Sequence, residues 1–186
     1  MCDLRLSIKS KSNLCYNALL FLQMEDLMIN RFAVVALCVA FMICGASGNE
    51  GAQDSLKSAQ VAIQKARDEY STALKGYFDS SIAFVTLQKG LDERVAKISE
   101  VAKASKSGAE QGQKVSSIMQ KVQAIEVELM EANDALQKAG ADKSTQSKYI
   151  ALKDRFVALS TKSTAQINQS KATLDNAIAV FKKYVN

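Results

Sequence analysis

Apolar and small residues recur every three or four positions through most of the chain after residue 58. This heptad-like spacing puts the residues on one face of a helix and is typical of helices that pack lengthwise on each other. The pattern predicts a first helix over about residues 52–106. Its buried row is expected to contain Ala59, Ile63, Ala66, Tyr70, Ala73, Tyr77, Ser80, Phe84, Leu87 and Leu91.

Two glycines, Gly108 and Gly112, interrupt the pattern and predict a turn at residues 107–112. Ser107 followed by Glu110 also fits a capping box, in which side chains satisfy the free N–H groups at a helix start. A second helix is expected over about residues 113–139, beginning as early as Gly108 or as late as Gln113. Its row is Val115, Ile118, Val122, Ile125, Leu129, Ala132, Leu136 and Ala139.

Gly140 is expected to end the second helix, because glycine adopts the left-handed cap conformation without steric cost. Asp142 and Ser144 are the candidate N-caps of a third helix over about residues 145–185. Its row is Tyr149, Leu152, Phe156, Leu159, Ser163, Ile167, Ser170, Leu174, Ala177, Phe181 and Tyr184.

At 1.5 Å per residue, the expected first helix is about 80 Å long and the expected second helix about 40 Å. Glycine in a helix interior costs about 1 kcal/mol, so a fold-back near Gly76–Gly90 would give four helices. The chain has no Pro, which permits long helices. The sequence thus predicts an all-α fold, an elongated antiparallel helical bundle of three long helices with coiled-coil-like packing, or four helices with that fold-back.

Residues 28–48 have the pattern of a signal peptide. Arg31 gives a positive start, residues 32–46 carry no charge, and residues 45–48 are small. The apolar run is shorter than the roughly 18–20 residues of a spanning helix. We expect cleavage near Asn49, an extracellular location and no stable membrane span afterwards. Residues 1–27 are expected to be a gene-model extension or a disordered leader. If they are translated, the signal could remain as an uncleaved anchor.

Residues 49–186 are then expected to form a single helical-bundle domain without cysteine. All four cysteines, Cys2, Cys15, Cys38 and Cys44, precede residue 45, and the chain has no His. These absences remove Ser/His/Asp and Cys/His hydrolases and His-ligated metal sites from consideration. The acidic run Glu126, Glu128, Glu131 and Asp134 has neither an EF-hand loop nor a Glu-x-x-His pair, and is interpreted as a solvated helix face. We assign no catalytic, cofactor-binding or metal-ligating residue.

The charges in residues 49–186 are interspersed, with 20 Lys and Arg against 16 Asp and Glu, a net charge of +4. Lys182-Lys183 is the one adjacent basic pair, so we expect no nucleic-acid partner. Asn168-Gln169-Ser170 is an N-glycosylation sequon, which makes Asn168 a candidate acceptor.

These patterns favour a secreted, non-enzymatic helical bundle that acts by protein–protein interaction or self-association, with a partner that the sequence does not identify. The alternative is a secreted carrier of lipid or another apolar ligand, because amphipathic helices can exchange packing partners for a lipid surface. In its content of Ala, Gln and Lys, without Cys after the signal peptide, the chain is similar to insect apolipophorins. That resemblance is compositional, and it implies the carrier function.

Overall fold

The computed structural model describes residues 50–138 and 142–185. The predictions for residues 1–27, for the signal peptide at 28–48 and for the four cysteines lie outside these residues. The predicted roles of Ala139 and Gly140 lie outside them as well.

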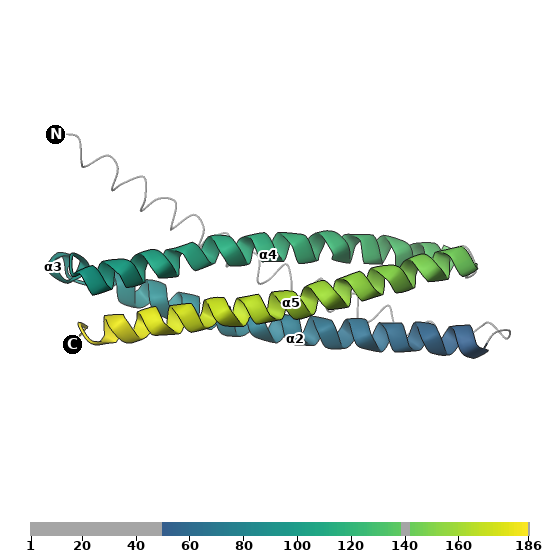
Figure 1. The fold of residues 1–186 in the computed structure, drawn as a ribbon, viewed down its shortest axis with the longest axis horizontal. Coiled ribbons are helices and arrows are strands. Elements are labelled where there is room, and N and C mark those ends of the chain that lie inside the picture. The colour runs from purple at the N-terminus through teal and green to yellow at the C-terminus, as the bar shows by residue number, and fades with distance from the viewer. Residues whose placement is uncertain (1–49, 139–141, 186) are drawn as a thin grey trace, which may run out of the picture. The chain divides into compact units, whose positions relative to one another are not determined.

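Three helices of 40 residues each form an all-α bundle (Figure 1): α2 (Glu50–Lys89), α4 (Ser99–Lys138) and α5 (Lys143–Lys182). A four-residue helix, α3 (Glu93–Ala96), lies between α2 and α4. Each long helix spans about 60 Å at 1.5 Å per residue. The predicted class, an all-α bundle of three long helices, is confirmed. No helix in the described ranges has the length and hydropathy needed to span a membrane.

The chain folds back at residues 90–92, and the turn predicted at 107–112 is wrong. Gly90 ends α2, where its N–H donates to the carbonyl oxygens of Thr86 and Leu87 at 3.3 and 3.0 Å. Asp92 then caps α3, accepting a hydrogen bond from the Arg94 N–H at 2.8 Å. The fold-back lies at the C-terminal limit of the range Gly76–Gly90, and it makes the long helices equal in length.

Helix α4 continues through residues 107–112 because Gly108 has a packing role. Gly108 is buried against the Phe84 ring of α2, and a Cβ at Gly108 would overlap the ring atoms. The Ser107 carbonyl accepts a hydrogen bond from the Gln111 side chain at 2.9 Å, inside the helix. The roughly 1 kcal/mol cost of a helical glycine is therefore offset by packing of the Phe84 side chain of α2 against Gly108. Ser107 and Glu110 do not begin a helix.

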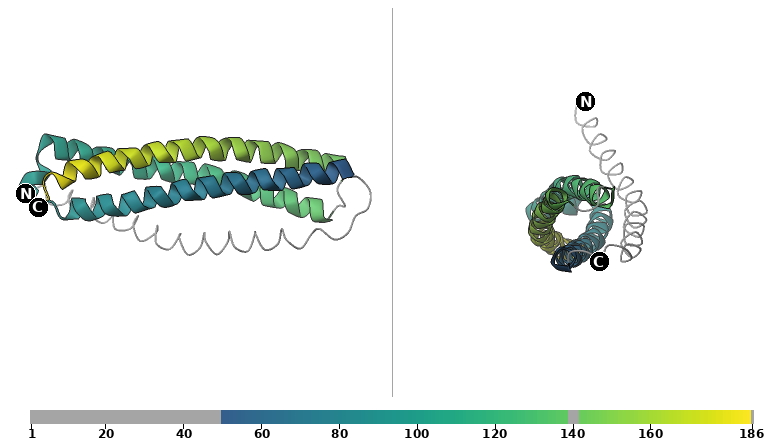
Figure 2. Two further views of the ribbon diagram at one scale, coloured as in Figure 1. Left: turned by 90° about the horizontal axis from the view of Figure 1, so that it is seen from below. Right: turned by 90° about the vertical axis from the view of Figure 1, so that its right-hand side faces the viewer.

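Helix α5 packs along both α2 and α4, whereas α2 and α4 approach each other less closely. Figures 1 and 2 show that α2 and α5 run in the same direction and that α4 runs opposite to both. In the α4–α5 pair, Glu100 contacts Lys183 and Glu128 contacts Arg155. The two contacts are 28 residues apart on each helix, so the register is constant over four heptads.

Most residues of the predicted rows are buried, as expected. In α2 the row is buried from Ala59 to Phe84, and Leu87 and Leu91 are partly exposed where the chain leaves the bundle. In α5 the row is correct except at Leu159 and Tyr184, which are partly exposed; Ser160 takes the buried place beside Leu159. The rings of Phe84 and Phe181 pack with centroids 5.2 Å apart near the fold-back.

Asp142 is the N-cap of α5, one of the two candidates predicted. Its carboxylate accepts a hydrogen bond from the Thr145 N–H at 2.6 Å. This bond lowers the pKa of Asp142 because it stabilises the charged form. The cap fixes where α5 begins, and hence its register on the other two helices.

Candidate functional site

A polar groove of about 480 Å³ runs between α4 and α5. It is partly open to solvent. Its lining residues are Gln111, Gln113, Lys114, Ser117, Ile118 and Lys121 of α4 and Gln166, Gln169, Ser170 and Thr173 of α5. We refer to this feature as the α4–α5 groove.

The groove exists because small and polar residues occupy positions where a large apolar residue would fill the seam. Ser170 lies on the buried row of α5 and is only 4% exposed. Gln111 lies on the buried row of α4, seven residues before Ile118, and is 5% exposed. Its side-chain N–H donates to the Ser107 carbonyl of the same helix, which holds the amide in place. Short side chains on such rows leave space between helices.

The chemistry of the lining is that of a binding surface. Amides and hydroxyls supply both donors and acceptors, and two ammonium groups add positive charge. Neither Lys114 nor Lys121 forms an ion pair with a described residue. No carboxylate or thiol is among the lining residues, so the groove offers hydrogen bonding and attraction for anions.

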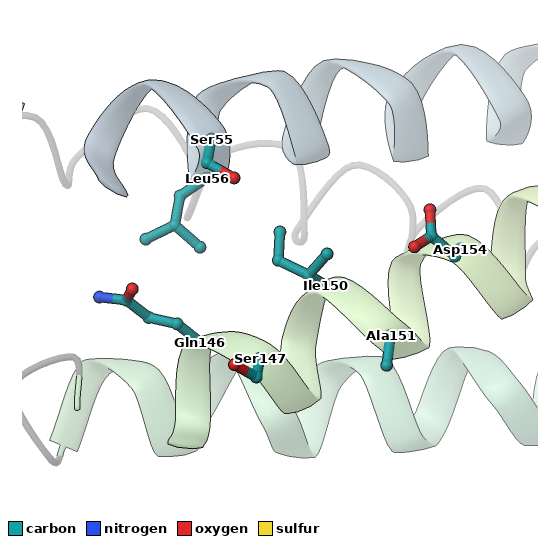
Figure 3. Close-up of a pocket in the computed structure, with 7 residues that line it drawn as sticks. All are labelled: Ser55, Leu56, Gln146, Ser147, Ile150, Ala151 and Asp154. Atoms are coloured by element: carbon teal, nitrogen blue, oxygen red, sulfur yellow. The ribbon is translucent and has the colours of Figure 1, made fainter. Parts of the chain in front are cut away.

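A second groove of about 410 Å³ lies between the first turns of α2 and α5. Leu56 of α2 and Ile150 of α5 point toward each other across it (Figure 3). Its other lining residues are Ser55, Gln146, Ser147, Ala151 and Asp154. A smaller share of its described lining residues is polar than in the α4–α5 groove, and Asp154 is the charged residue among them.

One ion pair connects α2 to α4 in the bundle interior. Arg67 Nε lies 2.8 Å from Glu126 Oε1, and the two side chains are only 15% and 19% exposed. The guanidinium carbon also lies 5.7 Å from the centre of the Phe156 ring of α5, within cation–π range. Arg67 therefore contacts both other long helices.

The charges of this pair act on two nearby tyrosines. Burial raises the pKa of Tyr70, and the Glu126 carboxylate raises it further because a second negative charge is disfavoured. Burial also raises the pKa of Tyr149, with Arg67 opposing the shift. Both phenols are therefore neutral at neutral pH. We interpret the cluster of Arg67, Glu126, Tyr70 and Tyr149 as a group of contacts that positions the three long helices.

The acidic run identified in the sequence does not converge. Glu126 pairs with Arg67 of α2, whereas Glu128 pairs with Arg155 of α5 at 3.3 Å. The two carboxylates therefore face different neighbouring helices. Asn168 is exposed on α5, and Ser170 of the same sequon lines the α4–α5 groove.

Of the residues that line the α4–α5 groove, only Ile118 and Ser170 are in the predicted rows, and the groove itself was not predicted. The signal was present, because Gln111 falls on the heptad row that continues through Ile118. Because a turn was expected at 107–112, Gln111 was placed at the turn, and its polar side chain was not recognised as part of a buried row.

No protein-family model, curated protein or solved structure matches this chain.

Proposed function

We propose that this chain is a secreted, non-enzymatic helical-bundle protein that acts by binding another protein through the α4–α5 groove. The observation that carries the proposal is the lining of this groove, in which Lys114 and Lys121 stand among amides and hydroxyls without an ion-pair partner in the described residues. Such a surface suits a polar partner segment that bears carboxylates. Charge complementarity of this kind raises association rates and selects partners.

Secretion is proposed on the pattern of residues 28–48, and the first measurement addresses it. The full chain is expressed in cultured eukaryotic cells, and the protein in the medium is analysed by N-terminal sequencing and intact mass. We expect a mature N-terminus near Asn49. Retention of the whole chain in the cells would contradict an extracellular role.

Partner binding is tested with a photo-crosslinker on a single introduced cysteine. The Ser117→Cys variant places the probe in the groove, and the matched Ser71→Cys variant places it on an exposed position of α2. In extracellular fluid from the source tissue we expect a crosslinked partner only with the groove probe. Adding Lys114→Glu and Lys121→Glu should abolish the crosslink. Equal crosslinking from both positions would contradict the groove as the site, and crosslinks between copies would indicate self-association.

A lipid carrier is the second candidate, and one observation favours it. The hydroxyls of Ser160 and Thr164 are buried without a hydrogen-bond partner among the described residues, which lowers the stability of the closed bundle. A bundle that opens at low cost could turn its buried rows toward lipid. Flotation of the secreted protein with phosphatidylcholine vesicles, together with a rise in helicity, would favour the carrier. Protein that stays below the vesicles with unchanged circular dichroism favours the binding protein.

A further inference from the structure

We infer that Asn168 is an acceptor for an N-linked glycan on the exposed face of α5. The residue begins the sequon Asn168-Gln169-Ser170, and its side chain is exposed in the folded bundle. The inference rests on the proposed secretion, because the transferase acts inside the secretory pathway. It is independent of which partner the α4–α5 groove binds.

The folded bundle has room for a sugar at this position. The Asn168 amide makes no hydrogen bond to a described residue, so glycosylation would break none of the described contacts. Ala165 and Ala172, about one turn away on either side, are both exposed and short. They belong to a row of exposed alanines that repeats every seven residues along α5: Ala151, Ala158, Ala165, Ala172 and Ala179. The short side chains of Ala165 and Ala172 leave space for the first sugar on that side of Asn168.

The burial of Ser170 determines when transfer can occur. Recognition of a sequon requires access to the hydroxyl two residues after the asparagine, but Ser170 is 4% exposed in the bundle. Transfer must therefore precede the packing of α5 against α2 and α4. The folded, unglycosylated protein should not be a substrate.

The step is a group transfer without oxidation or reduction. The donor is an oligosaccharide joined through pyrophosphate to a lipid. The bond between the sugar C1 and the phosphate oxygen breaks, and the lipid pyrophosphate leaves with the bonding electrons. A bond forms between C1 and Asn168 Nδ2, which loses one proton. The product is a neutral glycosylated amide, so the charge of the bundle does not change.

The test uses the full chain secreted from cultured eukaryotic cells. We expect an intact mass that decreases on treatment with peptide-N-glycosidase, which converts the glycosylated Asn168 to Asp. Asn168→Gln and Ser170→Ala should each abolish the decrease, whereas Ser170→Thr should keep it. Circular dichroism of each secreted variant checks that the bundle still forms.

A matched control separates failure of this inference from failure of secretion. In the Asn168→Gln background, Thr161→Asn creates the sequence Asn-Lys-Ser one heptad earlier on the same exposed row, with Ser163 buried as Ser170 is. A glycan on this control but none on the natural chain would overturn the inference and leave secretion intact. No protein in the medium and no glycan on either chain would overturn both proposals.

Discussion

Gly108 and Gly112 lie about one turn apart in α4, but their surroundings differ. Gly108 is buried against the Phe84 ring, whereas a Cβ at Gly112 would meet nothing within 4 Å. Both glycines carry the same intrinsic helix cost of about 1 kcal/mol. Only at Gly108 does contact with another helix compensate for this cost. Comparing substitutions at the two positions therefore distinguishes the effect of helix propensity from the effect of packing.

We expect Gly108→Ala to lower the free energy of unfolding by about 1–3 kcal/mol, because overlap with Phe84 outweighs the gain in helix propensity. The control, Gly112→Ala, should raise it by about 0.5–1 kcal/mol. Urea denaturation followed by circular dichroism measures both changes. A stabilised Gly108→Ala variant would show that α2 and α4 do not meet closely at this point.

Two buried serines make a second contrast at the residue scale. Ser160 Oγ has no hydrogen-bond partner in residues 50–138 and 142–185, whereas Ser80 Oγ donates to Asp175 Oδ1 at 2.7 Å. Asp175 also accepts a hydrogen bond from Lys171 at 2.6 Å. Together these donors lower the pKa of Asp175, Lys171 contributing most. Removing the Ser160 hydroxyl and removing the Ser80 hydroxyl should therefore change stability in opposite directions.

We expect Ser160→Ala to raise the free energy of unfolding by up to about 1 kcal/mol, because an unsatisfied hydroxyl no longer has to be desolvated. Ser80→Ala should lower it by about 1–2 kcal/mol through loss of a hydrogen bond to a carboxylate. Thermal and urea unfolding of both variants give the comparison. If Ser160→Ala destabilises as much as Ser80→Ala, the Ser160 hydroxyl has a partner in solution and the argument for a loosened bundle fails.

At the scale of helices, the sequence predicted faces better than ends. The heptad rows identified the buried residues of α2 and α5 because side-chain direction follows directly from helical periodicity. The turn predicted at 107–112 was wrong. Glycine occurs both in turns and at close contacts between helices, so the residue type alone does not distinguish the two. The two roles of the glycine can be distinguished only from the position of Phe84 in the folded bundle. Phe84 lies on another helix, so the pattern within α4 does not reveal the contact.

The candidate site was harder to predict than the fold for the same reason. Ser170 was identified as a polar residue on a buried row, and Asn168 through its sequon. The α4–α5 groove, however, arises from the pairing of Gln111, Lys114 and Lys121 with residues of α5. Periodicity within one helix does not determine which residues of a second helix lie opposite. The Arg67–Glu126 pair was missed because its partners are 59 positions apart.

The register of α2 on α4 gives a prediction at this scale. Arg67 and Glu126 are mostly buried, whereas Arg155 and Glu128 are 59% and 48% exposed. A double-mutant cycle with Arg67→Met and Glu126→Gln should give a coupling energy of about 1–2 kcal/mol. The matched cycle with Arg155→Met and Glu128→Gln should give about 0.2–1 kcal/mol, since solvent screens exposed pairs. Equal coupling energies would contradict a special role for the buried pair.

In the whole bundle, the faces of α5 have different surroundings and different roles. One side packs on α2, where Ser80 donates a hydrogen bond to Asp175. Another side forms the α4–α5 groove with Gln169 and Ser170. The exposed face carries Asn168 beside the row of exposed alanines. A glycan on that face would leave α5 free to keep both of its helix contacts.

Alkaline pH should weaken the whole bundle, because its buried tyrosines are held neutral. Burial raises the pKa of Tyr77 to about 12, opposed by a hydrogen bond with Ser81. The pKa values of Tyr70 and Tyr149 are also raised, chiefly by burial. In the unfolded chain a phenol ionises near pH 10. A raised folded-state pKa contributes stability that is complete below about pH 10 and is lost between about pH 10 and 12 as the unfolded phenol ionises first.

We therefore expect the urea midpoint to be constant up to about pH 9 and to fall steeply above about pH 10. Tyr77→Phe removes one of the titrating groups, so its midpoint should fall less steeply over the same range. Slopes are compared, because this variant also loses the Ser81 hydrogen bond. Phenolate absorbance recorded in parallel should rise together with the loss of helical circular dichroism. Ionisation of all tyrosines near pH 10 in a protein that stays helical would contradict the burial of these side chains at the centre of the bundle.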